Sequence, residues 1–120
     1  MDLVSFITTE AGDDMIVSFA VQDRNEPTEI ESLTLLRTPK YEFIFDEHER
    51  GIHASFERFG DEDDYLEEAR YSEKEETIQL KMRAHTYVLD LRKLDRKQIN
   101  AMRKLLRKMN FDSCVKLSVV

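Results

Sequence analysis

The sequence has few of the residues from which disulfide frameworks, phosphate-binding loops and membrane spans are built. It contains 1 cysteine, 3 glycines, 2 prolines and no tryptophan. A single cysteine cannot form an internal disulfide, so nothing indicates an oxidising compartment. So few glycines exclude a glycine-rich phosphate loop. The longest nearly apolar run, Met15 to Val21, is far shorter than the roughly 20 residues that span a membrane, and the first residues, Met1 to Ser5, do not resemble a signal peptide. We therefore expect a cytoplasmic protein that does not insert into membranes.

The composition is that of a folded chain. Of the 120 residues, 41% are hydrophobic and 36% are charged. That apolar content is enough to build a core, and the length is close to the commonest size of one domain. We expect residues 1–120 to form a single domain.

Charge is distributed unevenly along the chain. The net charge is −7, but residues 1–91 carry 9 Lys and Arg against 23 Asp and Glu, whereas residues 92–120 carry 9 against 2. The chain is therefore acidic over three quarters of its length and basic at its end. Such an asymmetry bears on the choice of partner and not on the fold.

Alternating apolar and polar residues predict strands through the first ninety residues. Within them, 41–45 has the clearest alternation and is expected to pair with 52–56 in a hairpin. The run 65–71 combines strand spacing with helix-forming residues, and we favour a strand there. The segment 78–91 is one bent strand or two shorter ones. The expected strands are 3–8, 15–21, 30–37, 41–45, 52–56, 65–71, 78–91 and, near the end, 115–119.

The period then changes to that of an amphipathic helix, predicted over Arg96 to Met109. Asp95 is a good N-cap, and Gln98 stands where a capping box requires it. Asn110 suits a left-handed cap, from which Phe111 would fold back on the last turn. Taken together, the elements predict an α+β fold: a mostly antiparallel, strongly curved sheet or partly open barrel of about seven or eight strands, with one C-terminal amphipathic helix followed by a final strand.

One dense acidic cluster is the leading candidate for contact with a partner. It does not match the spacing of a calcium-binding loop, so we expect no metal there. Its side chains would complement a basic protein, and the association would weaken with salt. The predicted partner-binding residues are Asp61, Glu62, Asp63, Asp64, Glu67 and Glu68.

The basic face of the predicted helix is the alternative. Its long side chains form two rows opposite the apolar stripe, and no acid interrupts them. Such a face is either solvated or binds phosphates, nucleic acid or an acidic partner. Nucleic acid is less favoured because the chain is acidic overall and no aromatic residues lie among the basic ones of the helix to stack on nucleic-acid bases. The alternative anion-binding residues are Arg96, Lys97, Arg103, Lys104, Arg107 and Lys108.

No arrangement of residues indicates catalysis, a cofactor or a metal. His48 and His53 have no standard ligand spacing, Cys114 is expected to pack as a small apolar residue, and no serine lies in a nucleophile elbow. We expect no enzyme. A third reading is a sheet or barrel that holds a small ligand in a pocket lined by the aromatic residues Phe43, Phe45, Phe56 and Tyr87.

The small, acidic, sheet-rich profile, with the hairpin-like segment Asp46 to Ile52, resembles bacterial inhibitor and toxin-immunity proteins in outline. The resemblance implies protein binding and assigns a role to no residue. Our leading hypothesis is a small acidic non-catalytic module that binds another, basic protein, for example an inhibitor that covers the surface of a nuclease. A second copy of the chain, in a homodimer, is a further candidate partner.

Overall fold

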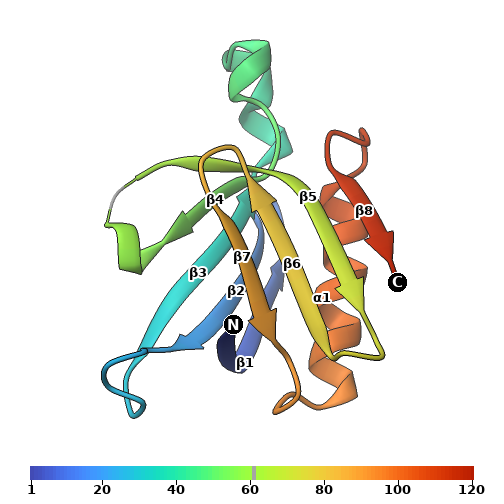
Figure 1. Cartoon of the computed structure of the whole chain (residues 1–120). Coiled ribbons are helices and arrows are strands. Elements are labelled where there is room, and N and C mark those ends of the chain that lie inside the picture. Colours follow the sequence, from blue (N-terminus) through green and yellow to red (C-terminus); the bar gives the residue numbers. More distant parts are fainter. Residues whose placement is uncertain (61) are drawn as a thin grey trace.

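A computed structural model describes residues 1–60 and 62–120 of the chain. Eight strands, one α-helix and three short 3-10 helices make up the fold (Figure 1). In chain order the elements are β1 (Asp2–Ala11), β2 (Met15–Gln22), β3 (Ile30–Arg37), η1 (Pro39–Ile44), η2 (Glu47–Glu49), β4 (His53–Phe56), η3 (Glu57–Phe59), β5 (Asp64–Ser72), β6 (Thr77–Met82), β7 (Thr86–Asp90), α1 (Arg96–Met109) and β8 (Lys116–Val119).

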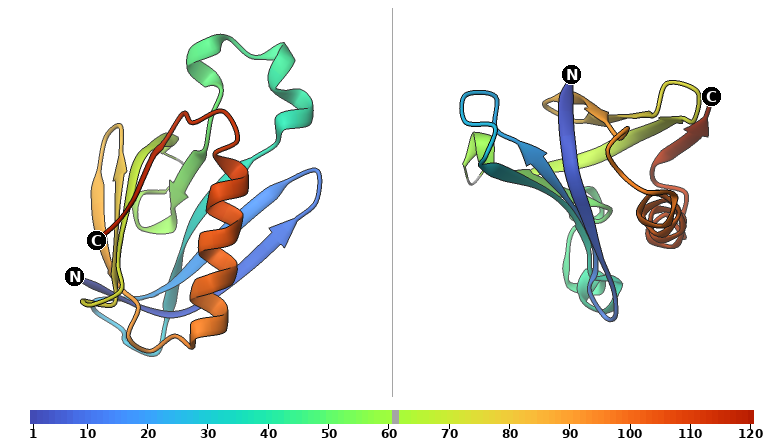
Figure 2. Two further views of the ribbon diagram at one scale, coloured as in Figure 1. Left: turned by 90° about the vertical axis from the view of Figure 1, so that its right-hand side faces the viewer. Right: turned by 90° about the horizontal axis from the view of Figure 1, so that it is seen from below.

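The strands form one mixed sheet that curves into a ring, as the two views of Figure 2 show. Its order is β4-β3-β2-β1-β7-β6-β5-β8, and a further pairing between β4 and β5 closes it. All neighbours are antiparallel except β1 with β7 and β5 with β8. The first residues of β5 pair with β4, whereas Glu68 to Tyr71 pair with β8. The ring is therefore closed at one end and open at the other, and the predicted α+β fold with a curved, partly open barrel is confirmed.

Helix α1 covers the open side of the ring and packs against β1 and β2 (Figure 2). Its predicted bounds are confirmed, and the Gln98 N–H donates to the Asp95 carboxylate at 2.8 Å, as an N-cap requires. The Gln98 side chain does not complete a capping box. Its Oε1 instead accepts the N–H of Ile7 at 2.8 Å. This bond joins the start of the helix to β1.

The core lies between α1 and the inner face of the ring. Met102 and Met109 of the helix and Phe19, Leu35 and Leu80 of the sheet are fully buried. The radius of gyration is 13.8 Å, close to the roughly 13.6 Å expected for one compact domain of this length. Among the residues that the structure describes, no helix is long and apolar enough to cross a membrane.

An irregularity in β1 explains its mixed apolar pattern. The register with β2 shifts between Val4 and Phe6. Before the shift the even-numbered side chains of β1 point into the core, and after it the odd-numbered ones do. Val4 and Ile7 are both buried although they are three positions apart, an odd spacing that an unbroken strand would place on opposite faces, and Phe6 is 44% exposed. In the sheet, β1 lies between β2 and β7.

The predicted strand over residues 41–45 is wrong. That stretch lies mostly in η1, where Pro39 occupies a first-turn position and the Tyr41 N–H donates to the Thr38 carbonyl at 3.2 Å. The predicted hairpin of 41–45 with 52–56 is therefore wrong as well, because β4 pairs with β3, Ala54 opposite Leu35. The segment from Thr38 to Gly51 leaves the sheet and projects from the body (Figure 1). The two ambiguous runs are resolved: 65–71 lies in the strand β5, and 78–91 is divided between the two strands β6 and β7.

The end of α1 also differs from its prediction. Asn110 has φ −92°, so it is not a left-handed cap. Its side-chain amide donates to the Val115 carbonyl at 2.8 Å, and its side-chain oxygen accepts the Val115 N–H at 2.9 Å. These bonds close a short loop in which Phe111 is 59% exposed and Cys114 is exposed rather than packed in the sheet.

Candidate functional site

The acidic loop between η3 and β5 is drawn towards two histidines. The Asp63 carboxylate lies 3.0 Å from His53 Nε2, and the Glu62 carboxylate lies 3.4 Å from His85 Nε2. Asp64 is buried, and its carboxylate accepts the backbone N–H groups of Tyr65 and Ala84. The predicted contact residue Asp61 lies outside the described residues.

The remaining acids of the predicted cluster lie on β5. Glu67 is exposed. Glu68 is half-buried, and its partners in the neighbouring strands are Lys81 of β6 and Lys116 of β8. Opposite charges at facing positions stabilise a sheet. The structure thus divides the predicted acidic contact set between a loop, a buried position and a strand, and does not bring it together as one surface.

The basic side chains of α1 fall into two rows with different surroundings. The arginine row faces β5 and its turn: Arg96 is 3.2 Å from the Glu73 carboxylate, and Arg103 lies over the Tyr71 ring at 4.5 Å. Arg107, one turn further, is exposed. The lysines of the second row, Lys97, Lys104 and Lys108, are all exposed. The structure keeps the six candidate anion-binding residues on one helix but separates the arginines from the lysines.

The four aromatic residues of the predicted ligand pocket do not line one cavity. Phe43 is 77% exposed, whereas Phe56 is 3% exposed and packs against the Tyr87 ring with centroids 5.3 Å apart. The space beside that pair measures only about 10 Å³, which is about enough for one water. Burial, together with the charges of Asp64 and Glu62, raises the pKa of Tyr87 to about 12. The Phe56 and Tyr87 rings therefore belong to the core or pack against it, and do not form a ligand pocket.

Sequence reasoning missed the most elaborate polar centre, which surrounds Arg37 at the end of β3. Its side chain is 1% exposed and donates to Glu42 at 2.8 and 2.9 Å and to Asp112 at 2.7 and 2.9 Å. It also donates to the Met109 carbonyl at 2.8 Å, and the Phe111 ring covers it at 4.1 Å. A buried guanidinium requires such saturation, because every unpaired donor would cost desolvation energy. The sequence did contain a signal, because Arg37 has the same alternation as Leu33 and Leu35, which point inward from β3.

The Arg37 centre links three parts of the chain. Glu42 belongs to the projecting segment, Asp112 follows α1, and Met109 is the last residue of the helix. Hydrogen bonding to Arg37 holds the pKa of Asp112 well below its usual range. Burial would lower the pKa of Arg37, but the bonds to Asp112 and Glu42 outweigh it and raise that pKa. Arg37 and Asp112 therefore stay charged, and the cluster fixes the root of the projecting segment to the helix end.

The projecting segment presents apolar side chains to solvent. Tyr41 is 50% exposed, Phe43 77% and Ile44 65%. Asp46 and Glu47, which follow Phe45, are also exposed. Contiguous apolar exposure of this kind on a compact protein marks interaction surfaces. We call the segment Pro39–Glu49 the aromatic protrusion.

A pocket of about 350 Å³ lies at the base of the aromatic protrusion. Its walls combine aromatic rings from the protrusion and from β5 with acidic side chains. Arg37, already bonded to Glu42, also lines it. The full lining among the described residues is Asp14, Leu36, Arg37, Thr38, Tyr41, Glu42, Phe45, Glu49, Gly51, His53 and Tyr65. Aromatic faces and carboxylates together favour a cationic group, such as the end of a lysine or arginine side chain.

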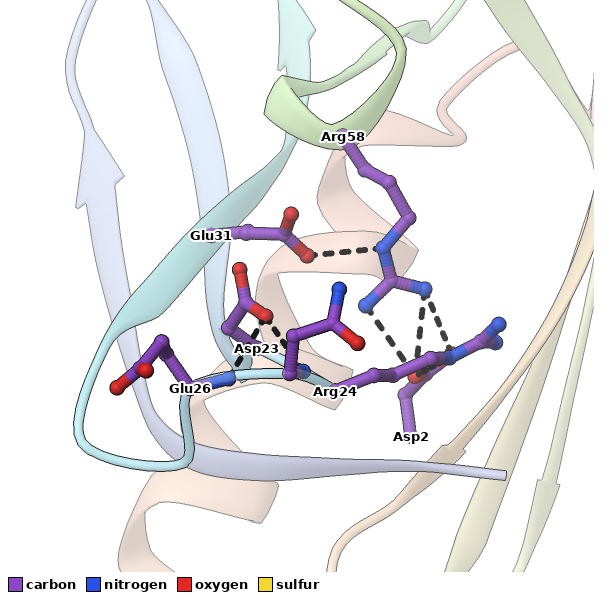
Figure 3. A network of polar contacts seen from close by, with 7 residues as sticks. Asp2, Asp23, Arg24, Glu26, Glu31 and Arg58 are labelled. Atoms are coloured by element: carbon purple, nitrogen blue, oxygen red, sulfur yellow. Dashed lines mark hydrogen bonds and ion pairs between the residues drawn. The ribbon is translucent and has the colours of Figure 1, made fainter.

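A second ionic network lies near the start of β3 (Figure 3). The buried carboxylate of Asp2 accepts hydrogen bonds from Arg24 at 2.9 and 3.1 Å and contacts Arg58 at 3.3 Å. Arg58 also donates to Glu31 of β3 at 2.8 Å. Burial alone would raise the pKa of Asp2, but the bond from Arg24 and the charge of Arg58 outweigh it and hold that pKa below its ordinary value. The network ties β1 to η3 and to the β2–β3 loop.

Comparison with known proteins supplies no further assignment. No protein-family model matches the chain, and neither the curated proteins nor the solved structures contain a significant match. The aromatic protrusion therefore stands as the candidate site on its geometry alone.

Proposed function

We propose that this protein is a non-catalytic binding module that inserts its aromatic protrusion into an apolar recess of another protein. The observation that carries the proposal is the exposure of Tyr41, Phe43 and Ile44 on a segment that Arg37 anchors to the body. Aromatic anchors that fill a pocket supply most of the energy of many interfaces. Because the Arg37 cluster fixes the root of the protrusion, less backbone conformational entropy is lost when the protrusion binds.

The charges around the protrusion favour a basic partner. Asp46 and Glu47 are exposed beside the anchors, and the base pocket carries the further acids Asp14 and Glu49. We propose that a basic side chain of the partner enters this pocket while the apolar anchors enter the recess. Charge complementarity of this kind raises the association rate and makes binding sensitive to salt.

The titratable groups with shifted pKa values support a role without catalysis. Arg37, Asp112 and Asp2 are held in ion pairs with defined partners. Although Cys114 as a residue is exposed, its sulfur lies 3.4 Å from the buried Arg37 guanidinium, and this partial burial raises the pKa of the thiol. A raised pKa disfavours the reactive thiolate. These groups stabilise the protein in their resting charge states and are not prepared to transfer a proton or attack a substrate.

The test is quantitative affinity capture from the native lysate at low salt, after nuclease treatment, with three forms of the tagged protein. These are the wild type, the variant Phe43→Ser/Ile44→Ser, and the control Phe6→Ser/Ile30→Ser, which removes one aromatic and one aliphatic side chain that are exposed elsewhere. We expect one basic protein to be captured by the wild type and the control and lost by the protrusion variant. Binding is then measured with that purified protein.

Equal capture by all three forms would overturn the proposal, since the anchors would then contribute nothing. A parallel capture without nuclease is the control, and a partner captured only there would instead favour nucleic-acid binding through the exposed lysines of α1. Sedimentation analysis distinguishes a further outcome. A wild-type dimer that becomes monomeric in Phe43→Ser/Ile44→Ser would replace the foreign partner with a second copy of the chain.

A further inference from the structure

A groove between α1 and the β5–β8 edge shares no lining residue with the base pocket of the aromatic protrusion. Its volume is about 190 Å³. Most of its walls are apolar side chains from the sheet and from one turn of the helix. The apolar lining residues are Ala69, Ile78, Leu106, Leu117 and Val119, together with the Tyr71 ring.

The helix contributes two arginines to the same groove. Arg103 and Arg107 are four residues apart, so they lie on the same side of α1. Arg103 is half-buried, with its guanidinium over the Tyr71 ring at 4.5 Å, whereas Arg107 is exposed. Arg96, by contrast, is paired with Glu73.

Neither groove arginine has a carboxylate partner among residues 1–60 and 62–120. Arg24, Arg37, Arg58, Arg92 and Arg96, by contrast, are in ion pairs. Two guanidiniums without acid partners beside an apolar slot favour a ligand that carries one anionic end and one apolar end.

We infer that this groove binds a small aliphatic carboxylate. Its tail would lie on Leu106, Leu117 and the neighbouring apolar wall, where each buried methylene gains about 0.8 kcal/mol. Its carboxylate would accept hydrogen bonds from Arg103 and Arg107, since the planar guanidinium matches a carboxylate in two-point geometry. The volume is below the roughly 300 Å³ at which drug-sized pockets begin, so the tail is short.

The lysine row of α1 offers a matched contrast. Lys104 and Lys108 have the same spacing and charge as Arg103 and Arg107, but they are exposed and line no described part of this groove. A ligand held by long-range attraction to the helix would depend on both rows equally. A ligand seated in the groove depends on the arginines alone.

The experiment titrates the full chain with sodium octanoate and follows binding by calorimetry and by backbone amide NMR shifts. Octanol and acetate, each at the same concentrations, test the carboxylate and the tail separately. The variants are Arg103→Gln/Arg107→Gln and the control Lys104→Gln/Lys108→Gln, which removes the same charge. We expect octanoate to shift amides of Leu106 and Leu117, and octanol and acetate to bind much more weakly. The arginine variant should lose roughly tenfold or more in affinity, the equivalent of one charge-assisted hydrogen bond.

Several outcomes would overturn the inference. Absence of saturable octanoate binding to the wild type would do so directly, as would equal weakening in the arginine and lysine variants. Shifts confined to the aromatic protrusion would place the ligand elsewhere. A thermal melt of each variant without ligand shows that the variant is folded, so that a loss of binding reports the site. This inference is independent of the proposed function, because the protrusion is unchanged in every variant.

Discussion

The two ends of β3 each carry a network of arginines and carboxylates, and the two are built in opposite ways. At the far end the cation is buried: Arg37 is 1% exposed, and its partner Asp112 is 43% exposed. Near the start the anion is buried: Asp2 is 5% exposed, and its partners Arg24 and Arg58 are 67% and 17% exposed (Figure 3). One network therefore holds two acids around a cation, and the other holds two cations around an acid.

The difference decides what each network does. A guanidinium has five N–H donors in a rigid plane and fixes several segments at once. Arg37 uses them to join the aromatic protrusion, the helix end and β3. A carboxylate only accepts hydrogen bonds. Asp2 uses them to attach the first residue of β1 to Arg24 and Arg58, whose charges solvent partly screens. The first network positions the candidate site, and the second maintains the scaffold.

The largest effect should come from Arg37→Met, because removal of one partner leaves Glu42, Asp112 and the Met109 carbonyl without their donor. We expect a loss of about 3–5 kcal/mol in the free energy of unfolding, as for other broken buried pairs. Urea denaturation measures it. The control Arg24→Met removes an arginine that is 67% exposed, while Arg58 still contacts Asp2, and should cost far less. Equal costs would contradict the contrast between the two networks.

Asp2→Asn should rank second. The neutral amide keeps the size of the side chain but leaves Arg58 without part of its pairing, although Glu31 still accepts from it. We expect a loss of about 1–3 kcal/mol, the range for an impaired buried hydrogen bond. The NMR shifts of the aromatic protrusion should stay unchanged in this variant and change in Arg37→Met. Altered protrusion shifts in Asp2→Asn would show that the two networks are coupled.

Acid should weaken both networks. The pKa values of Asp2 and Asp112 are lowered in the folded protein from an ordinary value of 3.8. Their contribution is therefore complete above that value and is lost as the pH falls through the lowered folded values. Urea titrations from about pH 6 downward should show a steeper loss of stability for the wild type than for Arg37→Met or Asp2→Asn. Parallel curves would indicate that other carboxylates dominate acid unfolding.

Alkali should act at Tyr87, whose ring packs on Phe56 beside Arg58 of the Asp2 network. The pKa of Tyr87 is raised from 10.0 to about 12, chiefly by burial. Its neutral form contributes stability that is complete below pH 10 and is lost as the pH rises through about 12. The phenolate absorbance of one tyrosine should appear at a higher pH than that of an ordinary tyrosine, close to pH 12. The variant Tyr87→Phe should remove this component of alkaline destabilisation, and an unchanged curve would assign it to another group.

The smallest effect on stability should come from the protrusion itself. Phe43 is 77% exposed, so Phe43→Ser should change the free energy of unfolding by less than about 0.5 kcal/mol. Chemical denaturation tests this directly. A larger loss would mean that the side chain packs against the body, which would weaken its assignment as an exposed anchor.

How far the sequence could predict the molecule depended on the range of the interactions involved. The helix from Arg96 to Met109 and its Asp95 cap depend on neighbours in the chain, and both were predicted. The run 41–45 has strand-like alternation, but its structure depends on Pro39 and on the capture of Glu42 by Arg37. That buried ion cluster also includes Asp112, which follows the helix, and no pattern of neighbouring residues predicts such a contact.

The candidate sites follow the same division. The acidic cluster is visible in the sequence as charge, but charge alone does not show that Asp64 points inward or that Glu68 lies between two lysines. The two rows of the basic helix were visible from its periodicity. What separates them is the neighbouring Tyr71 ring and the β8 edge, which only the pairing of distant strands brings there.

The span of the Arg37 cluster has a consequence for how the chain folds. Arg37 bonds to partners 72 and 75 residues further along the sequence. On the ribosome, the root of the protrusion must therefore wait until the helix and its following loop have emerged. Contacts so distant in sequence slow folding, because the intervening chain must be ordered first. Until then the exposed aromatic side chains and the uncompensated arginine belong to a nascent chain that is vulnerable to aggregation and in need of protection.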